Sequence, residues 1–335
     1  MAGIRDVARR AGVSPTTVSR FLNEDAGLSI TDETKKRIET AVADLAYVKG
    51  PAKRSRAASV AIVTTVSEAE EIDDPYFRSI RLGIFEEAKK QKLAANRIFR
   101  LDSEFRSEDL EPFGCVIILG HLEESFLEEL YSHNSELIVV DDPYTSEKYE
   151  TVYSDIEGAA RQQLERLYEK GHRQIAFIGG VRTAHLPDGS VTLDEEDVRT
   201  VTYKRWMAEK GLQDNIQLAL GEWSTLSGME LTEAFIEANK AALPSAIMVA
   251  SDPMAVGVYR AIQKAGLNIP EDISLVSFDN IEVSEYLTPP LSTVELRTNE
   301  LGRMAIRFAR EKIDGLRDYP LRCVIPGKII NRESE

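Results

Sequence analysis

The residue types that most often carry catalysis or bind metals are few in this chain and are not grouped. Its two cysteines, Cys115 and Cys323, each lie in an apolar run, which is typical of core thiols rather than of a disulfide or a metal site. The carboxylate run at 195–197 is typical of the solvated start of a helix. The histidines are expected to be structural or surface residues, and they are His121, His133, His172 and His185. These patterns predict no metal, no cofactor and no enzyme, and they favour a binding protein.

The charge of the chain is divided between a short basic segment and a long acidic remainder. Residues 1–58 carry 11 Lys and Arg against 7 Asp and Glu, whereas the rest of the 335 residues carry 30 basic and 49 acidic side chains. A basic head on an acidic body favours nucleic-acid contact by the head alone, with chance variation in a short segment as the alternative. The sequence has neither a long apolar span nor a secretory signal, so a cytoplasmic protein without a membrane partner is expected.

The first fifty residues have the pattern of three short helices. The first is predicted at Ile4–Ala11 and ends at Gly12, which can adopt the positive φ of a helix end. Ser14 is a good N-cap for a second helix that begins with Pro15 and runs to Leu22. A third helix, from about residue 31 to 46, has apolar residues spaced to cover the other two, namely Ile38, Ala41, Val42 and Leu45. Two short helices joined by a tight turn predict a helix-turn-helix. The alternative is a small helical bundle without a role in DNA binding.

The string IRDVARRAGVSPTTVSRFLN resembles the N-terminal signature of the LacI/GalR family of bacterial repressors. In that family the second helix reads bases through the two positions after the capping serine and through an arginine, which here are Pro15, Thr16 and Arg20. Pro15 has no side-chain donor, so Thr16 and Arg20 are expected to carry most of the direct readout. The resemblance assigns phosphate contacts, which position the head, to Thr17, Ser19 and Asn23.

The segment after the head departs from the family pattern. In the family this linker carries Ala-Arg-x-Leu, folds into a hinge helix on DNA and inserts the leucine into the minor groove. Here residues 52–55 read Ala-Lys-Arg-Ser, and no leucine is present. Lys53, Arg54 and Arg56 are therefore expected to follow the minor groove or to contact phosphates, with a solvated flexible linker as the alternative. The expected division is a head at 1–47, a linker at 48–58 and a body at 59–335.

The body alternates short apolar runs with helical stretches. Strands are predicted in two series, at 59–65, 96–101, 115–120 and 136–141 and then at 174–179, 245–251 and 273–278. Helical patterns separate them, which predicts two doubly wound parallel-sheet lobes. The resemblance extends over nearly the whole chain and implies a periplasmic-binding-protein-like α/β body on an all-α helix-turn-helix head. The first lobe is expected at about 59–154 and 294–318, and the second at about 155–293 and 319–335.

A sugar site is expected at the carboxyl ends of these strands, where such sheets bind ligands. A hexose needs polar partners for neighbouring hydroxyls and an apolar wall for its C–H face. The resemblance implies that Arg199 and Asp279 bind hydroxyls, while Asp141 and Ser251 follow predicted strands. Surface salt bridges are the alternative for the three charged residues. Four residues are expected to supply the wall, namely Trp223, Tyr153, Tyr76 and Pro75, with a plain core role as the alternative for Trp223.

The resemblance implies a homodimeric repressor of sugar-utilisation genes that binds double-stranded operator DNA and is released by a small sugar. The string EIDDPYFRSIRLGI is most similar to the β-galactosidase and galactose repressors, so galactose or a β-galactoside is the expected effector. The alternative is a regulator of the same fold that responds to another sugar, to a purine or nucleoside, or to a phosphoprotein corepressor. The sequence leaves open the operator sequence and whether the effector induces or corepresses.

Overall fold

The computed structural model describes residues 4–22, 30–45, 58–101, 105–188, 190–193 and 196–335. The chain divides into two units, Met1–Ser55 and Arg56–Glu335. Within the described ranges, no helix has the length and apolar character needed to cross a membrane. Four of the predicted DNA contacts, Asn23, Lys53, Arg54 and Arg56, lie outside the described residues, as does the side chain of a fifth, Ser19.

The first unit is the predicted set of three helices. Gly12 has φ +69°, and the Ser14 hydroxyl accepts a hydrogen bond from the Thr17 N–H at 3.0 Å, so Ser14 caps the second helix as expected. Apolar side chains from all three helices, among them Val7, Val18 and Ile38, are fully buried against one another. The helices are α1 (Ile4–Ala11), α2 (Pro15–Leu22) and α3 (Asp32–Asp44).

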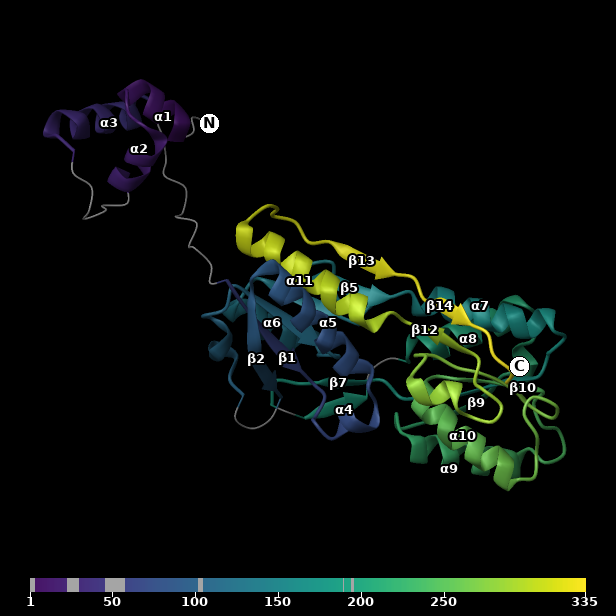
Figure 1. The fold of residues 1–335 in the computed structure, drawn as a ribbon. Coiled ribbons are helices and arrows are strands. Elements are labelled where there is room, and N and C mark those ends of the chain that lie inside the picture. Colours follow the sequence, from purple (N-terminus) through teal and green to yellow (C-terminus); the bar gives the residue numbers. More distant parts are fainter. Residues whose placement is uncertain (1–3, 23–29, 46–57, 102–104, 189, 194–195) are drawn as a thin grey trace. The chain divides into compact units, whose positions relative to one another are not determined.

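The first lobe of the second unit is built on a six-stranded parallel sheet in the order β13-β5-β4-β3-β1-β2. Figure 1 labels β13, β5, β1 and β2 of this sheet. Successive residues of its strands, such as Ile62 and Val63, belong to different apolar clusters, so both faces of the sheet are covered. The strands are β1 (Ser59–Thr64), β2 (Ala94–Arg100), β3 (Cys115–Leu119), β4 (Leu137–Val140), β5 (Glu150–Ser154) and β13 (Arg322–Ile325). The helices are α4 (Glu70–Asp73), α5 (Tyr76–Gln91), α6 (Glu124–His133), α11 (Thr298–Asp314) and the 3-10 turn η1 (Ser107–Leu110).

Helices α5 and α11 lie against each other so closely that their backbones touch. A Cβ atom on Gly302 would stand 2.0 Å from the carbonyl oxygen of Ile80, and one on Gly83 would stand 2.1 Å from that of Asn299. Only glycine permits such an approach at these two positions. Because α11 follows α5 by more than 200 residues in the sequence, this contact joins the two distant segments that make up the first lobe.

The second lobe is a four-stranded parallel sheet in the order β11-β10-β6-β9. Its core strands are buried on both faces, as the continuous apolar runs predict. The strands are β6 (Ile175–Gly180), β9 (Gln217–Gly221), β10 (Ala246–Val249) and β11 (Ser274–Val276). The helices are α7 (Ile156–Glu169), α8 (Val198–Glu209), α9 (Thr225–Ala238), α10 (Asp252–Lys264) and the 3-10 turns η2 (Gln213–Asn215) and η3 (Glu282–Glu285). Two antiparallel pairs complete the unit, β7 (Thr183–His185) with β8 (Val191–Leu193) and β12 (Thr293–Glu295) with β14 (Lys328–Ile330).

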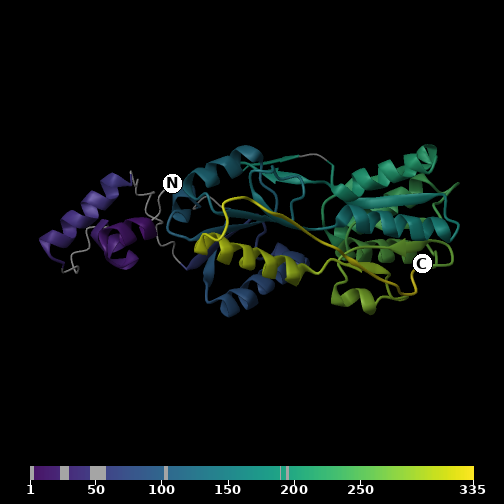
Figure 2. The same ribbon diagram turned by 90° about the horizontal axis from the view of Figure 1, so that it is seen from above.

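The assignment of residues 319–335 to the second lobe is wrong for the strand β13. Residues 322–325 pair in parallel with β5, so they form the edge of the first lobe's sheet, and the chain enters the second lobe only between β13 and β14. The yellow C-terminal segment follows this path from one lobe to the other in Figures 1 and 2. Conversely, the Val294 N–H donates to the Ser277 carbonyl at 3.1 Å, so the start of the expected 294–318 segment lies with the second lobe. Strand pairing over such long sequence separations leaves no local signal.

The chain crosses between the lobes three times, and the crossings are hydrogen-bonded to one another. The Ser154 hydroxyl donates to the Leu296 carbonyl at 3.1 Å, and the Asp155 N–H donates to the Ile325 carbonyl at 2.9 Å. Three adjacent connections of this kind form a single hinge, about which two lobes can turn. The two cysteines are both free, Cys115 buried in the first lobe and Cys323 half-buried on β13.

Candidate functional site

The predicted base-reading residues lie on the exposed side of α2. Pro15, Thr16 and Arg20 are exposed, while Thr17 is half-buried and its hydroxyl lies 2.8 Å from that of Ser14. Thr17 is therefore held at the start of the helix, which suits a residue that positions the head rather than one that reads bases. The helix thus presents Thr16 and Arg20 outward from a small rigid unit. These base-reading and phosphate-contacting roles stay predictions.

A pair of predicted effector residues from the first lobe is in direct contact. The Tyr76 hydroxyl donates to Asp141 Oδ1 at 2.7 Å. Tyr76 is the first residue of α5, and Asp141 follows β4 with φ +72°, a left-handed conformation that turns its side chain away from the strand direction. Pro75 directly precedes α5, and Asp74 beside it accepts a hydrogen bond from the Tyr76 N–H at 2.9 Å. The end of β4 and the start of α5 therefore bring three polar side chains together, those of Asp74, Tyr76 and Asp141.

Arg199 is the buried cation of the second lobe. It lies in the first turn of α8, is 7% exposed, and donates through Nη1 to both carboxylate oxygens of Asp197 at 3.1 Å. Its guanidinium carbon stands 5.3 Å from the ring centroids of both Trp223 and Phe278. The Nε atom is buried and has no hydrogen-bond partner. Burial would lower the pKa of Arg199, but the charges of Asp197 and Asp279 raise it overall. Asp197 thus holds the charged guanidinium through Nη1, while its Nε–H group has no acceptor among the described residues.

Asp279 follows β11 and lies near Arg199. Its backbone has φ +106°, and its Oδ2 atom accepts a hydrogen bond from the Asp252 N–H at 3.2 Å. Asp252 is itself fully buried and accepts hydrogen bonds from the hydroxyls of Ser284 and Thr293 at 2.6 and 2.8 Å. The Asp252 network therefore fixes the loop that carries Asp279.

The carboxylates from the two lobes influence one another strongly. Burial raises the pKa of Asp141 to about 7, against the hydrogen bond from Tyr76 and the charge of Arg199. Burial and neighbouring carboxylates raise the pKa of Asp279 well above its ordinary value. Burial also raises the pKa of Asp74, opposed by the Tyr76 N–H and by Arg199. Since Arg199 is already paired with Asp197, the cluster is rich in acceptors and poor in positive charge. It suits a ligand that offers several hydroxyl donors.

The other predicted effector residues are more loosely connected to this cluster. Trp223 donates through Nε1 to the Val181 carbonyl at 2.9 Å, and its ring covers Gly180, where a Cβ atom would stand 2.2 Å from the indole. Gly180 is therefore required for the position of the ring. Ser251 is buried and caps α10, accepting from the Met254 N–H at 3.4 Å. Its hydroxyl is thus engaged in the helix cap, which gives it a structural role in addition to the predicted one.

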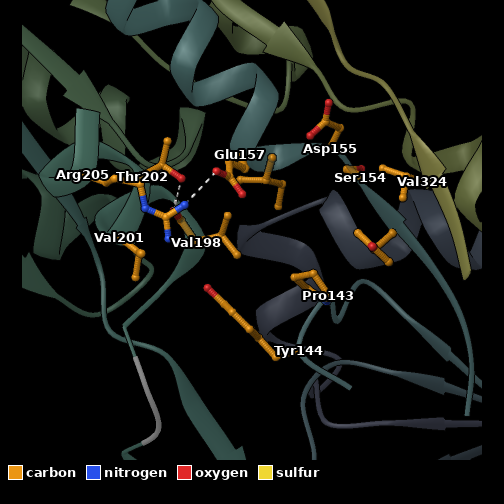
Figure 3. Close-up of a pocket in the computed structure, with 12 residues that line it drawn as sticks. Pro143, Tyr144, Ser154, Asp155, Glu157, Val198, Val201, Thr202, Arg205 and Val324 are labelled. Carbon is orange, nitrogen blue, oxygen red and sulfur yellow. Dashed lines mark hydrogen bonds and ion pairs between the residues drawn. The ribbon is translucent and has the colours of Figure 1, made fainter. Parts of the chain in front are cut away.

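Tyr153 lines a cavity of about 410 Å³ between elements of the two lobes. Figure 3 shows Pro143 and Tyr144 on one side of this cavity and α8 residues, including Val198 and Arg205, on the other. Tyr153 alone of the predicted effector residues is part of its lining. The structure therefore brings Tyr76, Asp141, Arg199, Asp279 and Trp223 into one neighbourhood and leaves Tyr153 at this adjacent cavity.

Sequence reasoning missed three residues of the cluster. Asp74, Asp197 and Phe278 each lie one or two positions from a predicted site residue, so the neighbourhood was identified but not these side chains. Asp197 was expected in a solvated helix start, whereas it is the N-cap of α8 and pairs with Arg199. No signal in the sequence distinguished a solvated carboxylate from one that holds a buried guanidinium.

Comparison with known proteins gives two domain matches. Residues 3–49 match the model for bacterial regulatory proteins of the lacI family, and residues 164–335 match the model for the periplasmic binding protein-like domain. The chain is 31% identical over 343 residues to the HTH-type transcriptional repressor MelR of Bacillus subtilis (strain 168), covering 100% of this chain and 97% of the relative. It is 32% identical over 338 residues to the HTH-type transcriptional regulator GalR of Streptococcus thermophilus, covering 100% and 99%.

The chain belongs to the LacI family of bacterial transcription regulators. Solved structures agree with this in fold. A complex of the transcriptional regulator CelR with cellobiose has a TM-score of 0.70 at 24% identity and covers 100% of both chains. A lac repressor dimer bound to operator has a TM-score of 0.67 at 22% identity and covers 99% of this chain and 98% of that one. The predicted family and the two-part fold of this LacI-family regulator are thereby confirmed. It is a sugar-responsive, DNA-binding transcription regulator and not an enzyme.

Proposed function

We propose that this LacI-family regulator represses sugar-utilisation genes and is released from its operator by galactose or a β-galactoside. The observation that carries the proposal is the unpaired Nε atom of buried Arg199 beside the carboxylates of Asp141 and Asp279. A guanidinium donor and two acceptors suit adjacent hydroxyls of a sugar, and the Trp223 ring next to Arg199 offers a face for its C–H groups. The relative named GalR and the string EIDDPYFRSIRLGI support the galactoside class.

The charge of the cluster favours a neutral sugar over an anionic effector. Asp74, Asp141 and Asp279 surround one guanidinium whose charge is already matched by Asp197. Burial raises the pKa values of these three carboxyls, so negative charge is disfavoured in this desolvated cluster, and a phosphate placed there would carry the same penalty. Sugar phosphates and nucleotides are therefore disfavoured relative to free sugars.

The experiment is isothermal titration calorimetry together with a gel shift on operator DNA. We expect binding of galactose, lactose or allolactose, with release of the DNA, and little binding of galactose 6-phosphate or AMP. Absence of heat and of release with all three sugars would overturn the galactoside assignment. Tight binding of the phosphorylated compounds would instead overturn the argument from charge.

We expect Arg20→Ala to remove discrimination between operator and scrambled DNA. An arginine that donates to guanine O6 and N7 contributes about 1–3 kcal/mol of discrimination, so the specific affinity should fall roughly 5- to 150-fold towards the nonspecific level. Lys53→Ala and Arg54→Ala serve as the contrast, since loss of a phosphate contact weakens binding to all sequences and flattens its salt dependence. Fluorescence anisotropy at several salt concentrations separates the two effects. A retained preference for the operator in Arg20→Ala would refute the assignment of the reading helix.

We expect the protein to be a homodimer at micromolar concentration. One small helix-turn-helix head reads only one half-site, and a two-fold dimer reads two half-sites about one helical turn apart. The lac repressor of similar fold was solved as a dimer on its operator. Sedimentation velocity measures the assembly directly, and a monomer or a stable tetramer under these conditions would contradict the expectation.

A further inference from the structure

A strap of the second lobe, residues 181–185, binds the first lobe although the chain does not cross there. It follows β6 and ends with β7. The His185 carbonyl accepts from the Glu123 N–H at 3.0 Å, and the His185 N–H donates to the His121 carbonyl at 3.3 Å. Leu122 and His185 form a parallel bridge. The strap is therefore joined by backbone hydrogen bonds to the segment that follows β3 of the opposite lobe.

Arg182 adds a buried ion pair to this attachment. Its Nη2 atom lies 3.1 Å from Asp142 Oδ1, and the two side chains are only 12% and 3% exposed. His121 also contacts the Asp142 carboxylate, and the Arg182 guanidinium stands 4.4 Å from the Tyr144 ring centroid. Burial alone would raise the pKa of Asp142, but the hydrogen bond and charge of His121 and the charge of Arg182 outweigh it and lower the pKa. Asp142 is thus charged at neutral pH and depends on partners from both lobes.

The first two residues of the strap contact residues in or next to the effector cluster. At its start, the Val181 carbonyl accepts the indole N–H of Trp223, the proposed wall for the sugar ring. The next residue, Arg182, donates to Asp142, the immediate neighbour of Asp141. The three chain crossings form the hinge of the unit, as described above, and the strap is a separate connection that involves no crossing. Opening the lobes about the hinge at this edge would break the Arg182–Asp142 pair and the two backbone hydrogen bonds.

We propose that the strap at 181–185 is a clasp that keeps the two lobes together around a bound effector, with Arg182 as its positioning residue. This inference rests on the proposed function of the Arg199 cluster as the effector site. A ligand that contacts residues of both lobes is released only when they separate, so the clasp slows effector release. Arg182 acts through Asp142 and the strap rather than by touching the effector.

The first test is hydrogen–deuterium exchange on the whole chain without any effector. In Arg182→Ala we expect the amides of Glu123 and His185 to exchange at least tenfold faster, because opening of the clasp exposes them. The exchange rates of the β10 amides should be the same as in the wild type, which would show that the second lobe is still folded. Arg182→Lys retains the charge and should restore part of the protection. Arg161→Ala is the matched control, since it removes a half-buried arginine paired with Glu209 at 2.7 Å inside the second lobe. If the Glu123 and His185 amides exchange in Arg182→Ala at the same rate as in the wild type, the proposal of a clasp is overturned.

The second test is stopped-flow kinetics with galactose, which separates entry from release. We expect Arg182→Ala to release the sugar at least tenfold faster while its association rate stays within about threefold of the wild type. Arg182→Lys should be intermediate, and Arg161→Ala should match the wild type. A wild-type release rate in Arg182→Ala would overturn the proposal. If galactose does not bind the wild type at all, the proposed function fails, and the exchange experiment still decides whether the clasp exists.

Discussion

Replacement of Arg199 by alanine is expected to weaken effector binding by at least about 100-fold while operator affinity stays within about threefold. Hydrogen bonds to charged groups contribute about 1.5–3 kcal/mol each, and a factor of 100 corresponds to about 2.7 kcal/mol. Arg199 is the cation of the cluster, and its loss also removes the charge that offsets Asp141 and Asp279. Without that charge the pKa values of these two carboxyls would rise further, so fewer charged acceptors would remain for the hydroxyls of a ligand.

The measurement for Arg199→Ala pairs calorimetry with a gel shift. Operator affinity is expected to persist because the residue belongs to the body of the chain, in the unit 56–335, and not to the helix-turn-helix head. Arg161→Ala, on α7 of the same lobe, controls for loss of an arginine elsewhere. By thermodynamic reciprocity, operator DNA must also weaken sugar binding to the wild type by the same factor as the sugar weakens DNA binding. Full response to the sugar in Arg199→Ala would remove Arg199 from the site.

The second large effect is expected for Asp141→Asn, which should stabilise the protein at alkaline pH while weakening its response to sugar. The folded-state pKa of Asp141 is raised to about 7, compared with about 3.9 in an unfolded chain. A group with a raised folded pKa contributes stability that is fully present below the unfolded pKa and is lost as pH rises through the folded pKa. The loss from this carboxyl therefore falls between about pH 4 and pH 8 and amounts to a few kcal/mol.

Asparagine removes that loss because it stays neutral, and its amide oxygen can still accept the hydrogen bond from Tyr76. We expect Asp141→Asn to melt at a higher temperature than the wild type at pH 8, with the gap closing towards pH 5. Sugar affinity at pH 8 should fall about tenfold, since a charged acceptor is replaced by a neutral one. Differential scanning calorimetry across this pH range checks the stability, and Asp318→Asn, at an exposed aspartate, is the control. A difference in melting temperature between Asp141→Asn and the wild type that does not depend on pH would contradict the argument. So would a lower melting temperature for Asp141→Asn at pH 8.

The tension between stability and binding at Asp141 is a general property of such sites. A buried carboxylate without a cation of its own costs folding free energy, and it is retained where a ligand supplies the missing hydrogen bonds. Asp279 has the same character, with its pKa raised by burial and by neighbouring carboxylates. The unpaired Nε of Arg199 is the complementary feature on the donor side. Together they describe a cluster that is organised in advance for a polar, uncharged guest.

The sequence by itself was sufficient for the features that depend on local order. The cap at Ser14, the turn at Gly12 and the three helices of the head follow from residue types within a few positions of one another. The apolar runs of β1, β3, β6 and β10 were located because strands buried on both faces are continuously apolar. The resemblance then proposed Arg199 and Asp279 as site residues, and the position of Asp141 directly after a predicted strand added the third.

Tertiary structure alone decided which distant segments meet. β13 is a short strand whose side chains are alternately exposed and half-buried, and only its pairing with β5 assigns it to the first lobe. The sequence pattern predicts a solvated carboxylate at Asp197, and only the fold shows that Asp197 pairs with the buried guanidinium of Arg199. Arg182 is 40 residues away from Asp142 and 61 residues away from His121 in the sequence. No periodic pattern links these three positions. Local patterns record how each residue is buried in its own element, whereas a site between lobes depends on how separate elements are packed, and that information is spread over the whole chain.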